Sequence, residues 1–290
     1  GGRVKPSQFA YHAPQRVDEA VGLLAEHGFE AKVLAGGQSL VPMLSLRLTS
    51  FAHLVDINGV SGLDSIDVVD GDLRIGANVR QARAEHDPTV AEAAPLVAAA
   101  IPHIGHFQIR NRGTVGGSIA HADPASELPA VALALDAVME AGGPDGERTI
   151  AASDFFESTW ETSLDDDEIL TAVRFPRWSG SSGFAVEEVA RRHGDFALVG
   201  AVCGVTLDGD AVTRAGIALF GVGPTPIRAS DAEAALVAAG STGDLAEVGR
   251  AAAEPLDPND DLHASGAYRK KVAAVVVERA LTTAIQEARS

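Results

Sequence analysis

Two glycine-rich segments of the sequence contain the residue types that bind phosphate groups. The first is Val33-Leu-Ala-Gly-Gly-Gln-Ser-Leu40 and the second is Thr114-Val-Gly-Gly-Ser118. Glycine lets the backbone approach a ligand and turn its N–H groups toward it, and the neighbouring hydroxyl groups add donors. Either segment alone is more typical of an ordinary tight turn. The two together favour a pair of loops that clamp one dinucleotide by its pyrophosphate.

The motifs of several other enzyme classes are missing from the sequence. The nearest approach to a Rossmann fingerprint, Gly221-Val-Gly-Pro-Thr-Pro226, lacks the third glycine. Gly116-Gly-Ser-Ile-Ala120 ends in alanine where the nucleophile turn of a serine hydrolase has glycine. His103 and His106 have a metal-binding spacing, but no carboxylate is in register and Gly105 weakens a helix there. We therefore predict no catalytic side chain and no metal site in this chain.

The single cysteine limits the redox chemistry of the chain. Cys203 lies in the apolar run 199–207, which predicts a buried strand and an unreactive thiol. One thiol cannot form an internal disulfide or hold an iron–sulfur cluster. Any iron must therefore lie on another polypeptide.

Composition and charge narrow the class further. The 290 residues are 46% hydrophobic and 22% charged, which is typical of a globular chain of about two domains. The formal net charge of −17 disfavours nucleic acid as a ligand. No apolar run is long enough to span a membrane, and the first residues do not resemble a signal peptide. We expect a cytoplasmic protein that is not integral to a membrane.

The first glycine loop is expected within a small α/β unit. A helix ended by Gly28 is predicted by apolar residues at helical spacing. These are Val17, Ala20, Val21, Leu24 and Ala25. Strands are expected over 31–35 and 53–57, with a helical turn over 39–46 between them. The pattern predicts a subdomain over residues 3–58.

The second glycine loop lies in a stretch with a different pattern. Asp70-Gly71 separates two alternating segments and predicts a hairpin. Helices are expected over 90–101 and 128–137, followed by strands that end at Phe175. An α+β subdomain is therefore predicted over residues 59–177.

A C-terminal domain is predicted over residues 184–290. The preceding segment, 178–183, is rich in small residues and predicts a linker with little packing. Strand candidates over 184–191, 199–207 and 212–220 suit an antiparallel sheet. A final helix, 268–287, should lie on this sheet through one apolar stripe. The stripe consists of Ala273, Val276, Val277, Ala280, Leu281 and Ala284.

The glycine segments also carry a resemblance to a known family. The sequence resembles the FAD-binding medium subunits of the molybdenum hydroxylases, such as aerobic carbon monoxide dehydrogenase and the three-subunit xanthine, nicotine and ketone dehydrogenases. The matching segments are Ala35-Gly-Gly-Gln-Ser-Leu40, Gln108-Ile-Arg-Asn-Arg-Gly-Thr-Val-Gly-Gly-Ser118, Ala120-His-Ala-Asp-Pro124, Arg191-Arg-His-Gly-Asp-Phe196 and Ser265-Gly-Ala-Tyr-Arg269. The resemblance covers almost the whole chain.

The resemblance implies a fold and an assembly. The implied fold is α+β, with two FAD-binding subdomains similar to those of vanillyl-alcohol oxidase before an α+β C-terminal domain with an antiparallel sheet. The implied partners are a small subunit with two [2Fe–2S] clusters and a large subunit with a molybdenum pterin cofactor, in a dimer of heterotrimers. Electrons would reach FAD on this chain and leave to NAD, a quinone, a cytochrome or oxygen. This chain would then be an oxidoreductase subunit.

The resemblance also assigns cofactor-binding positions. Those around the first loop are Lys32, Val33, Leu34, Ala35, Gly36, Gly37, Gln38, Ser39 and Leu40. Those of the second loop are Thr114, Gly116, Gly117 and Ser118. Ile104, Leu170 and Phe196 match apolar or aromatic positions near the flavin ring, and the loop 192–196 would control access of the oxidant. No His, Cys or Tyr in the two loops is placed to attach the ring, so we expect FAD to bind non-covalently.

Three positions depart from the family pattern. Glu127 replaces the usual aspartate that hydrogen-bonds the cofactor, and it keeps the carboxylate. Glu187 stands where xanthine dehydrogenases have lysine, so a cation beside the flavin is not expected. Gln38 stands where carbon monoxide dehydrogenases typically have histidine, which favours an organic substrate for the assembly.

Two other functions remain open on the sequence alone. One is a free-standing flavoenzyme of the same fold with its own substrate pocket. The other is a dinucleotide-binding regulatory or scaffold subunit without a redox role.

Overall fold

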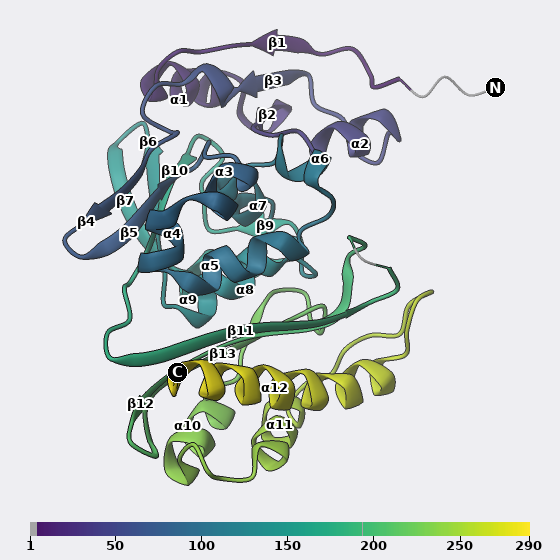
Figure 1. Ribbon diagram of the computed structural model, residues 1–290. Coiled ribbons are helices and arrows are strands. Elements are labelled where there is room, and N and C mark those ends of the chain that lie inside the picture. The colour runs from purple at the N-terminus through teal and green to yellow at the C-terminus, as the bar shows by residue number, and fades with distance from the viewer. Residues whose placement is uncertain (1–4, 193) are drawn as a thin grey trace.

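The structure is a computed structural model that describes residues 5–192 and 194–290. Its elements follow the chain order from an N-terminal layer through a middle layer to a C-terminal layer (Figure 1). The first two residues of the predicted 3–58 subdomain, and His193 of the predicted 192–196 loop, lie outside the described residues.

The N-terminal layer is a three-stranded parallel sheet of order β1-β3-β2. Its elements are β1 (Ala10–His12), α1 (Val17–His27), β2 (Ala31–Leu34), α2 (Leu40–Ser45) and β3 (His53–Asp56). The predicted helix, strand, loop, helix and strand are all confirmed. Gly28 ends α1 in a conformation with φ of 51° and donates its N–H to the carbonyl of Leu24.

The middle layer contains an antiparallel sheet of order β4-β5-β10-β6-β7. Its strands are β4 (Ile66–Val69), β5 (Asp72–Gly76), β6 (Val138–Gly143), β7 (Gly146–Ala151) and β10 (Ile169–Phe175). The hairpin predicted at Asp70-Gly71 is confirmed. Both turn residues have positive φ, 54° and 92°, as a type I′ turn requires.

Short helices cover this sheet. They are α3 (Gln81–His86), α4 (Pro88–Ala93), α5 (Pro95–Ala100), α6 (Phe107–Arg110), α7 (Val115–His121), α8 (Glu127–Ala134) and α9 (Ala152–Phe155). A small hairpin of β8 (Phe156–Ser158) and β9 (Glu161–Thr162) follows α9, and short 3₁₀ turns cover 28–30, 57–59 and 101–103.

Two of the predicted helices of this layer need correction. The helix expected over 90–101 is divided at Ala94, which has φ of −142° and ψ of 72°. The following Pro95 disfavours a helical conformation at the residue before it, so one helix ends and another begins. The helix expected over 128–137 ends at Ala134, and Asp136 then adopts a left-handed φ of 57°.

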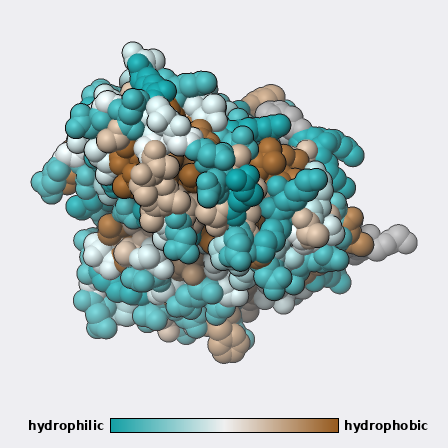
Figure 2. Space-filling view, turned by 90° about the horizontal axis from the view of Figure 1, so that it is seen from below, coloured by the Kyte–Doolittle hydropathy of each residue, from teal (hydrophilic) through white to brown (hydrophobic). Residues whose placement is uncertain are grey.

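The C-terminal layer is an antiparallel sheet of order β11-β12-β13-β14 with helices on one side. Its strands are β11 (Ser181–Ala190), β12 (Ala197–Asp208), β13 (Ala211–Phe220) and β14 (Ile227–Arg228), and its helices are α10 (Ser230–Ala239), α11 (Leu245–Ala253) and α12 (Gly266–Ala288). The three predicted strands and the terminal helix are confirmed. All six residues of the predicted stripe on α12 are buried, in one core with β12. The outer face of this layer is mostly hydrophilic, with apolar residues in small separate groups (Figure 2).

The segment 178–183, predicted to pack little, is well packed instead. Trp178 is buried, its ring meets Phe184 edge-on at 5.4 Å, and the Arg214 guanidinium lies 4.0 Å from the ring centroid. Residues 181–183 already belong to β11. The small residues are needed because a Cβ at Gly183 would collide with the α12 backbone at Ala284 and Ala288.

One hydrophobic core joins the middle and C-terminal layers. Phe184, Val202 and Phe220 of the C-terminal sheet belong to the same buried cluster as Leu128 of α8 and Leu96 of α5. The other face of the sheet packs on α12, and a third core lies between α1 and the first sheet. The two layers are therefore held together by apolar burial along the length of the sheet. Among the described residues, no helix is both long and apolar enough to cross a membrane.

Candidate cofactor site

The two glycine loops, which come from different layers, are in direct contact. A Cβ added at Gly36 would collide with the backbone carbonyl of Arg112 and lie 2.7 Å from the Cα of Gly113. Only glycine leaves room for this approach. The fold thus brings together two segments that are more than seventy residues apart in sequence.

A second contact joins the loops at Gly117. A Cβ there would lie 3.3 Å from the Cβ of Ala35 and 2.7 Å from the hydroxyl oxygen of Thr114. Thr114 precedes α7, and its hydroxyl oxygen accepts the N–H of Gly117 at 2.9 Å. Thr114 is also buried, which fixes the position of the loop. Gly116 is equally constrained, because its Cβ would lie 2.5 Å from the Cα of Ala77.

A polar network beneath the loops ties them to each other. Asn58 donates to the carbonyl of Ala35 at 2.8 Å and also to the carboxylate of Asp56. The Arg80 guanidinium donates to the Asn58 side-chain oxygen at 2.7 Å and to the backbone carbonyl of Arg112. One arginine therefore links the first loop, through Asn58, to the second.

The electrostatics of the network suit an anionic ligand. Burial lowers the pKa of Arg80, the nearby positive charge of Arg112 lowers it further, and Asp56 opposes both effects. A bound anion would relieve the repulsion between the two guanidinium groups. Asp56, Asn58, Arg80 and Arg112 were not among the predicted site residues.

A surface cavity of about 380 Å³ opens between these groups. Its lining consists of Leu34, Ala35, Gly36, Gly37, Gln38, Val41, Pro42, Asp56, Asn58 and Arg112. Five of the nine positions assigned around the first loop therefore line the cavity. Gly37 adopts a φ of 73°, and Gln38 donates to the carbonyl of Gly36 at 3.2 Å. The cavity wall combines the glycines of the first loop with apolar side chains and with the polar groups of Asp56, Asn58 and Arg112.

The other four positions of the first loop lie beside the cavity. The Val33 side chain packs on the core beneath α1, so only its backbone faces the loop. Ser39 and Leu40 begin α2. Lys32 is exposed, and its ammonium group lies 5.9 Å from the ring centroid of Phe51. Whether these residues touch a ligand stays a prediction.

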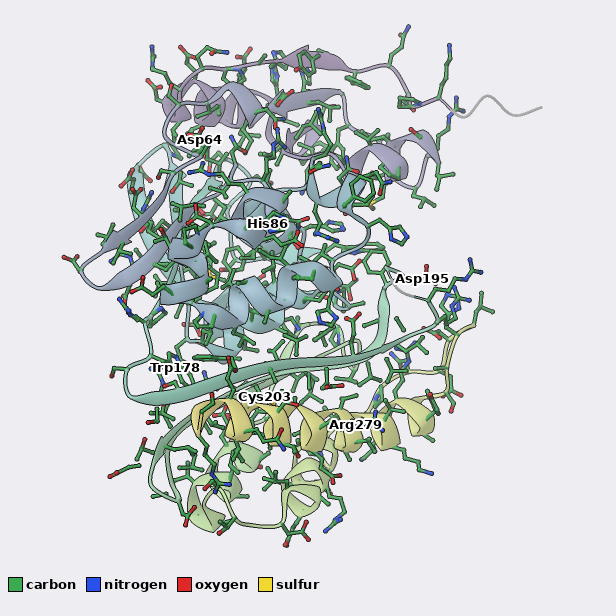
Figure 3. The ribbon with its side chains drawn as sticks, viewed as in Figure 1. Asp64, His86, Trp178, Asp195, Cys203 and Arg279 are labelled. Atoms are coloured by element: carbon green, nitrogen blue, oxygen red, sulfur yellow. The ribbon has the colours of Figure 1, made fainter. Side chains whose placement is uncertain are left out.

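The positions predicted to lie near a flavin ring are found in and around the middle layer. Ile104 is partly buried against its core, and Leu170 of β10 is buried in that core. Phe196 is 66% exposed at the start of β12. The loop that carries it reaches the middle layer, because a Cβ at Gly194 would lie 2.6 Å from the His106 ring and 3.1 Å from the carbonyl of Gly105. Asp195 marks this loop in Figure 3.

An acidic cluster lies where β11 meets the middle layer. Glu127, the first residue of α8, is 6% exposed, and burial raises the pKa of its carboxyl group to about 8. The Glu188 carboxylate raises this pKa further, whereas His103 lowers it. Glu127 is therefore largely protonated at neutral pH, and a protonated carboxyl can donate a hydrogen bond.

His103 and Glu188 form the ionic part of this cluster. The His103 Nδ1 lies 3.4 Å from a Glu188 oxygen, and the hydrogen bond that His103 donates to Glu188 raises the pKa of His103. The second Glu188 oxygen is buried with no partner among the described residues. His103 thus pairs with a carboxylate of β11.

The predicted position Glu187 lies on the other side of β11. Side chains alternate along a strand. Phe184 and Val186 pack on the middle layer, whereas Ala185 and Val189 pack in the core beneath α12. The alternation directs Glu188 toward the middle layer and Glu187 away from it. Glu188 was missed because the alternation cannot be oriented until the sheet is placed.

Two side chains of chemically reactive types, Cys203 and His121, lie in environments that favour their neutral forms. Cys203 is fully buried in β12, and burial raises the pKa of its thiol, as the sequence predicts (Figure 3). Burial also lowers the pKa of His121, which Lys32 lowers further and Asp123 opposes. The His121 ring stacks on Trp160 at 6.2 Å.

Comparison with known proteins covers both parts of the chain. The model of a family described as "FAD binding domain in molybdopterin dehydrogenase" matches residues 7–178. The model described as "CO dehydrogenase flavoprotein C-terminal domain" matches residues 184–284. The two matches leave few residues uncovered.

Curated relatives are similar over nearly their full length. The chain is 43% identical over 288 residues to the 6-hydroxypseudooxynicotine dehydrogenase complex subunit alpha of Paenarthrobacter nicotinovorans, with 99% of this chain and 97% of that protein covered. It is 37% identical over 280 residues to the carbon monoxide dehydrogenase medium chain of Hydrogenophaga pseudoflava, with 96% and 98% covered.

Solved structures agree with this likeness. A chain of carbon monoxide dehydrogenase from Hydrogenophaga pseudoflava superposes with a TM-score of 0.93 at 38% identity, covering 97% of this chain and 99% of that one. A chain of quinoline 2-oxidoreductase from Pseudomonas putida 86 gives 0.93 at 36% identity, covering 99% and 100%.

Proposed function

The chain belongs to the FAD-binding medium subunits of the molybdenum hydroxylases, and from this premise we propose that it receives electrons on FAD from iron–sulfur clusters of a partner subunit and passes them to an external acceptor. The observation that carries the proposal is the contact between the glycine loops over a common cavity. Two loops from two layers can hold the two halves of one extended dinucleotide.

The residues of this chain fit the pyrophosphate of FAD. The close approach of Gly36 to Arg112 and of Gly117 to Ala35 brings the two glycine loops together with no side chain between them. Ser39 and Ser118 add hydroxyl donors, and the buried Thr114 holds the second loop in place. Arg80 and Arg112 supply the positive charge that a diphosphate needs.

The flavin ring would lie toward the C-terminal layer. Ile104 and Leu170 offer apolar contacts there, and Phe196 offers an exposed aromatic face. The protonated Glu127 would donate a hydrogen bond to the cofactor. When bound, FAD supplies the electron-transfer chemistry, while the chain supplies position and electrostatic tuning. The exposed loop 194–196 would limit the approach of the oxidant.

The proposal extends to the organisation of the chain. Residues 3–177 would form the FAD-binding domain in two subdomains similar to those of vanillyl-alcohol oxidase, and residues 184–290 the C-terminal domain, with the packed segment 178–183 between them. The assembly would contain a small iron–sulfur subunit and a large molybdenum subunit, as a dimer of heterotrimers. Because Gln38 replaces histidine and the relatives include a 6-hydroxypseudooxynicotine dehydrogenase subunit, an organic substrate on the large subunit is favoured.

Purification from the native source tests the proposal. The chain should copurify with two other polypeptides, and metal analysis of the assembly should find iron and molybdenum with one FAD per copy of this chain. Denaturation should release the FAD and leave the bare polypeptide mass. A yellow chain that purifies alone with full activity would favour the free-standing flavoenzyme, and a colourless assembly would favour the scaffold.

A further inference from the structure

Three histidines from distant parts of the sequence meet at the N-terminal layer. His12 is the last residue of β1, His27 the last of α1 and His53 the first of β3. The His12 Nε2 lies 3.0 Å from the His53 Nδ1. The His27 and His53 rings are stacked, with centroids 3.6 Å apart and planes 10° from parallel. One ring nitrogen from each histidine lies within 4.8 Å of the others.

The fold explains why these side chains converge. In the parallel pairing of β1 with β3, Ala10 lies opposite His53 and His12 opposite Val55. Alternation puts all four on one face of the sheet, and α1 covers this face through a core that contains Val55. The last turn of α1 therefore brings His27 to the point where His12 and His53 meet.

The cluster has the chemistry of a transition-metal site. Imidazole nitrogens bind Zn²⁺, Cu²⁺ and Ni²⁺, and three of them with one open position for water form a common set. The three side chains are half-buried, so they are held in place yet reachable. No ion pair to any of them occurs in the part of the chain that the structure describes. The C-terminal end of α1 also favours a cation at His27.

Accepting an ion requires the side chains to turn, because the stacked His27 and His53 rings hold their in-plane nitrogen lone pairs in parallel planes and do not direct them at one shared point. Zinc–nitrogen bonds of about 2.0–2.1 Å in a tetrahedral site place ligand nitrogens about 3.3 Å apart. The His12 and His53 nitrogens would separate by a few tenths of an ångström. Since one of the two now donates a hydrogen to the other, that ring would also adopt its other tautomer.

We propose that His12, His27 and His53 bind one borderline divalent transition-metal ion, Zn²⁺ among the common ones, with at least one coordination position left for water. The ion would tie β1, an edge strand of three residues, to α1 and β3. The site is separate from the glycine-loop cavity, because β3 runs from His53 to Asp56, roughly 10 Å at the strand rise per residue. The ion would thus stabilise the layer that carries the first glycine loop without touching the cofactor.

The test uses the full FAD-loaded chain and Zn²⁺ alone, titrated against a coloured chelator. The wild type should bind one Zn²⁺ per chain, and His27→Gln and His53→Gln should each weaken binding by at least about tenfold, since loss of a second-shell partner alone costs that much. His86→Gln, at an exposed histidine in α3 (Figure 3), is the matched control and should change nothing.

X-ray absorption at the zinc edge gives an independent readout. It should count three imidazole ligands in the wild type and in His86→Gln, and fewer in the two cluster variants. FAD content should be unchanged in all, which separates this site from the cofactor site. If His53→Gln does not fold, the Zn²⁺ affinity and the ligand count of His27→Gln, a change at the end of α1, still test the proposal. Equal Zn²⁺ affinity in wild type and His27→Gln, or a zinc site built from oxygen ligands, would overturn the proposal.

Discussion

The glycine-loop cavity and the junction with the C-terminal sheet are built in opposite ways. The cavity lies beside two backbone segments that approach closely at Gly36 and Gly117. The junction is formed by the ionisable side chains of Glu127, His103 and Glu188 where β11 meets the middle layer. We expect the first arrangement to hold a ligand by shape and the second to set protonation states. Two regions with such separate roles suit a cofactor such as FAD, which has an anionic pyrophosphate in its middle and a redox-active ring at one end.

The largest effect is expected at the junction, from Glu127→Gln. The pKa of Glu127 is raised from 4.5 to about 8 in the folded chain, so its contribution to stability is present below pH 4.5 and lost as the pH rises through about 8. The Gln variant lacks this loss. It should match the wild type near pH 4.5 and exceed it at pH 8 by up to roughly 5 kcal/mol, at about 1.36 kcal/mol per unit of pKa difference.

Urea unfolding at several pH values measures this difference. The control is Glu26→Gln, which changes an exposed carboxylate on α1 and should show the wild-type pH dependence. A constant difference between Glu127→Gln and wild type across the range would mean that Glu127 is ionised throughout and that the junction does not set its protonation.

Gly36→Ala tests the cavity with a single added methyl group. The Cβ would collide with the Arg112 backbone, so the two loops must separate. FAD affinity should fall at least about 100-fold, equivalent to about 3 kcal/mol, which is within the cost of overpacking a tight contact. Gly22→Ala is the control, because a Cβ there has nothing within 4 Å. Fluorescence titration with FAD compares them, and equal affinities would show that the loops need not touch.

Arg80→Met tests whether the hydrogen bonds that link the two loops contribute to FAD binding as much as the close approach at Gly36. The change removes the hydrogen bonds to Asn58 and to the Arg112 carbonyl. FAD should bind about tenfold more weakly, since a hydrogen bond from a charged group contributes about 1.5–3 kcal/mol. Arg83→Met removes an exposed arginine of α3, the helix that Arg80 precedes, and this variant should bind FAD normally. Equal losses of FAD affinity in Arg80→Met and Arg83→Met would show that the effect comes from the loss of one positive charge and not from the two hydrogen bonds of Arg80.

The smallest effect is expected from His103→Gln. The pKa of His103 is raised by Glu188, so the pair stabilises the fold below about pH 6.5 and this contribution is lost as the pH rises through the raised value. The side chain is a third exposed, which limits the effect to about 1 kcal/mol. Unfolding at pH 6 and pH 9 should show a loss of stability at the lower pH only. An equal loss of stability at pH 6 and at pH 9 would indicate that His103 contributes through packing and not through its charge.

The contrast between the two regions also explains what the sequence could predict. The glycine loops were predicted because the residues that make such a cradle are neighbours in the chain. Arg80 and Asn58 were missed because single polar residues in turns carry no spacing signal. The pairing of His103 with Glu188 depends on how β11 faces α5 and the 3₁₀ turn that follows it, which only the packed sheet determines. Glu187, the position that the sequence analysis singled out, lies next to Glu188 on the opposite face of β11.

The fold itself was predictable where local rules act alone. The hairpin at Asp70-Gly71 and the apolar stripe of α12 follow from turn chemistry and helical spacing. Pro95 was present in the sequence as a signal for the break in the alanine-rich helix, but apolar spacing suggested continuity. The segment that begins at Trp178 was predicted to be a linker because small residues are typical of linkers. Close packing of Gly183 against α12 also requires a small residue, so the sequence alone could not separate the two cases.

Flavin reduction with and without partners tests the central claim most directly. The FAD-loaded chain, shown by elemental analysis to be free of iron and molybdenum, is mixed with the substrate of the native assembly while flavin absorbance is followed. We expect no bleaching by the chain alone, bleaching with dithionite, and substrate-dependent bleaching only after the iron–sulfur and molybdenum subunits are added. Bleaching by substrate with this chain alone would contradict the account.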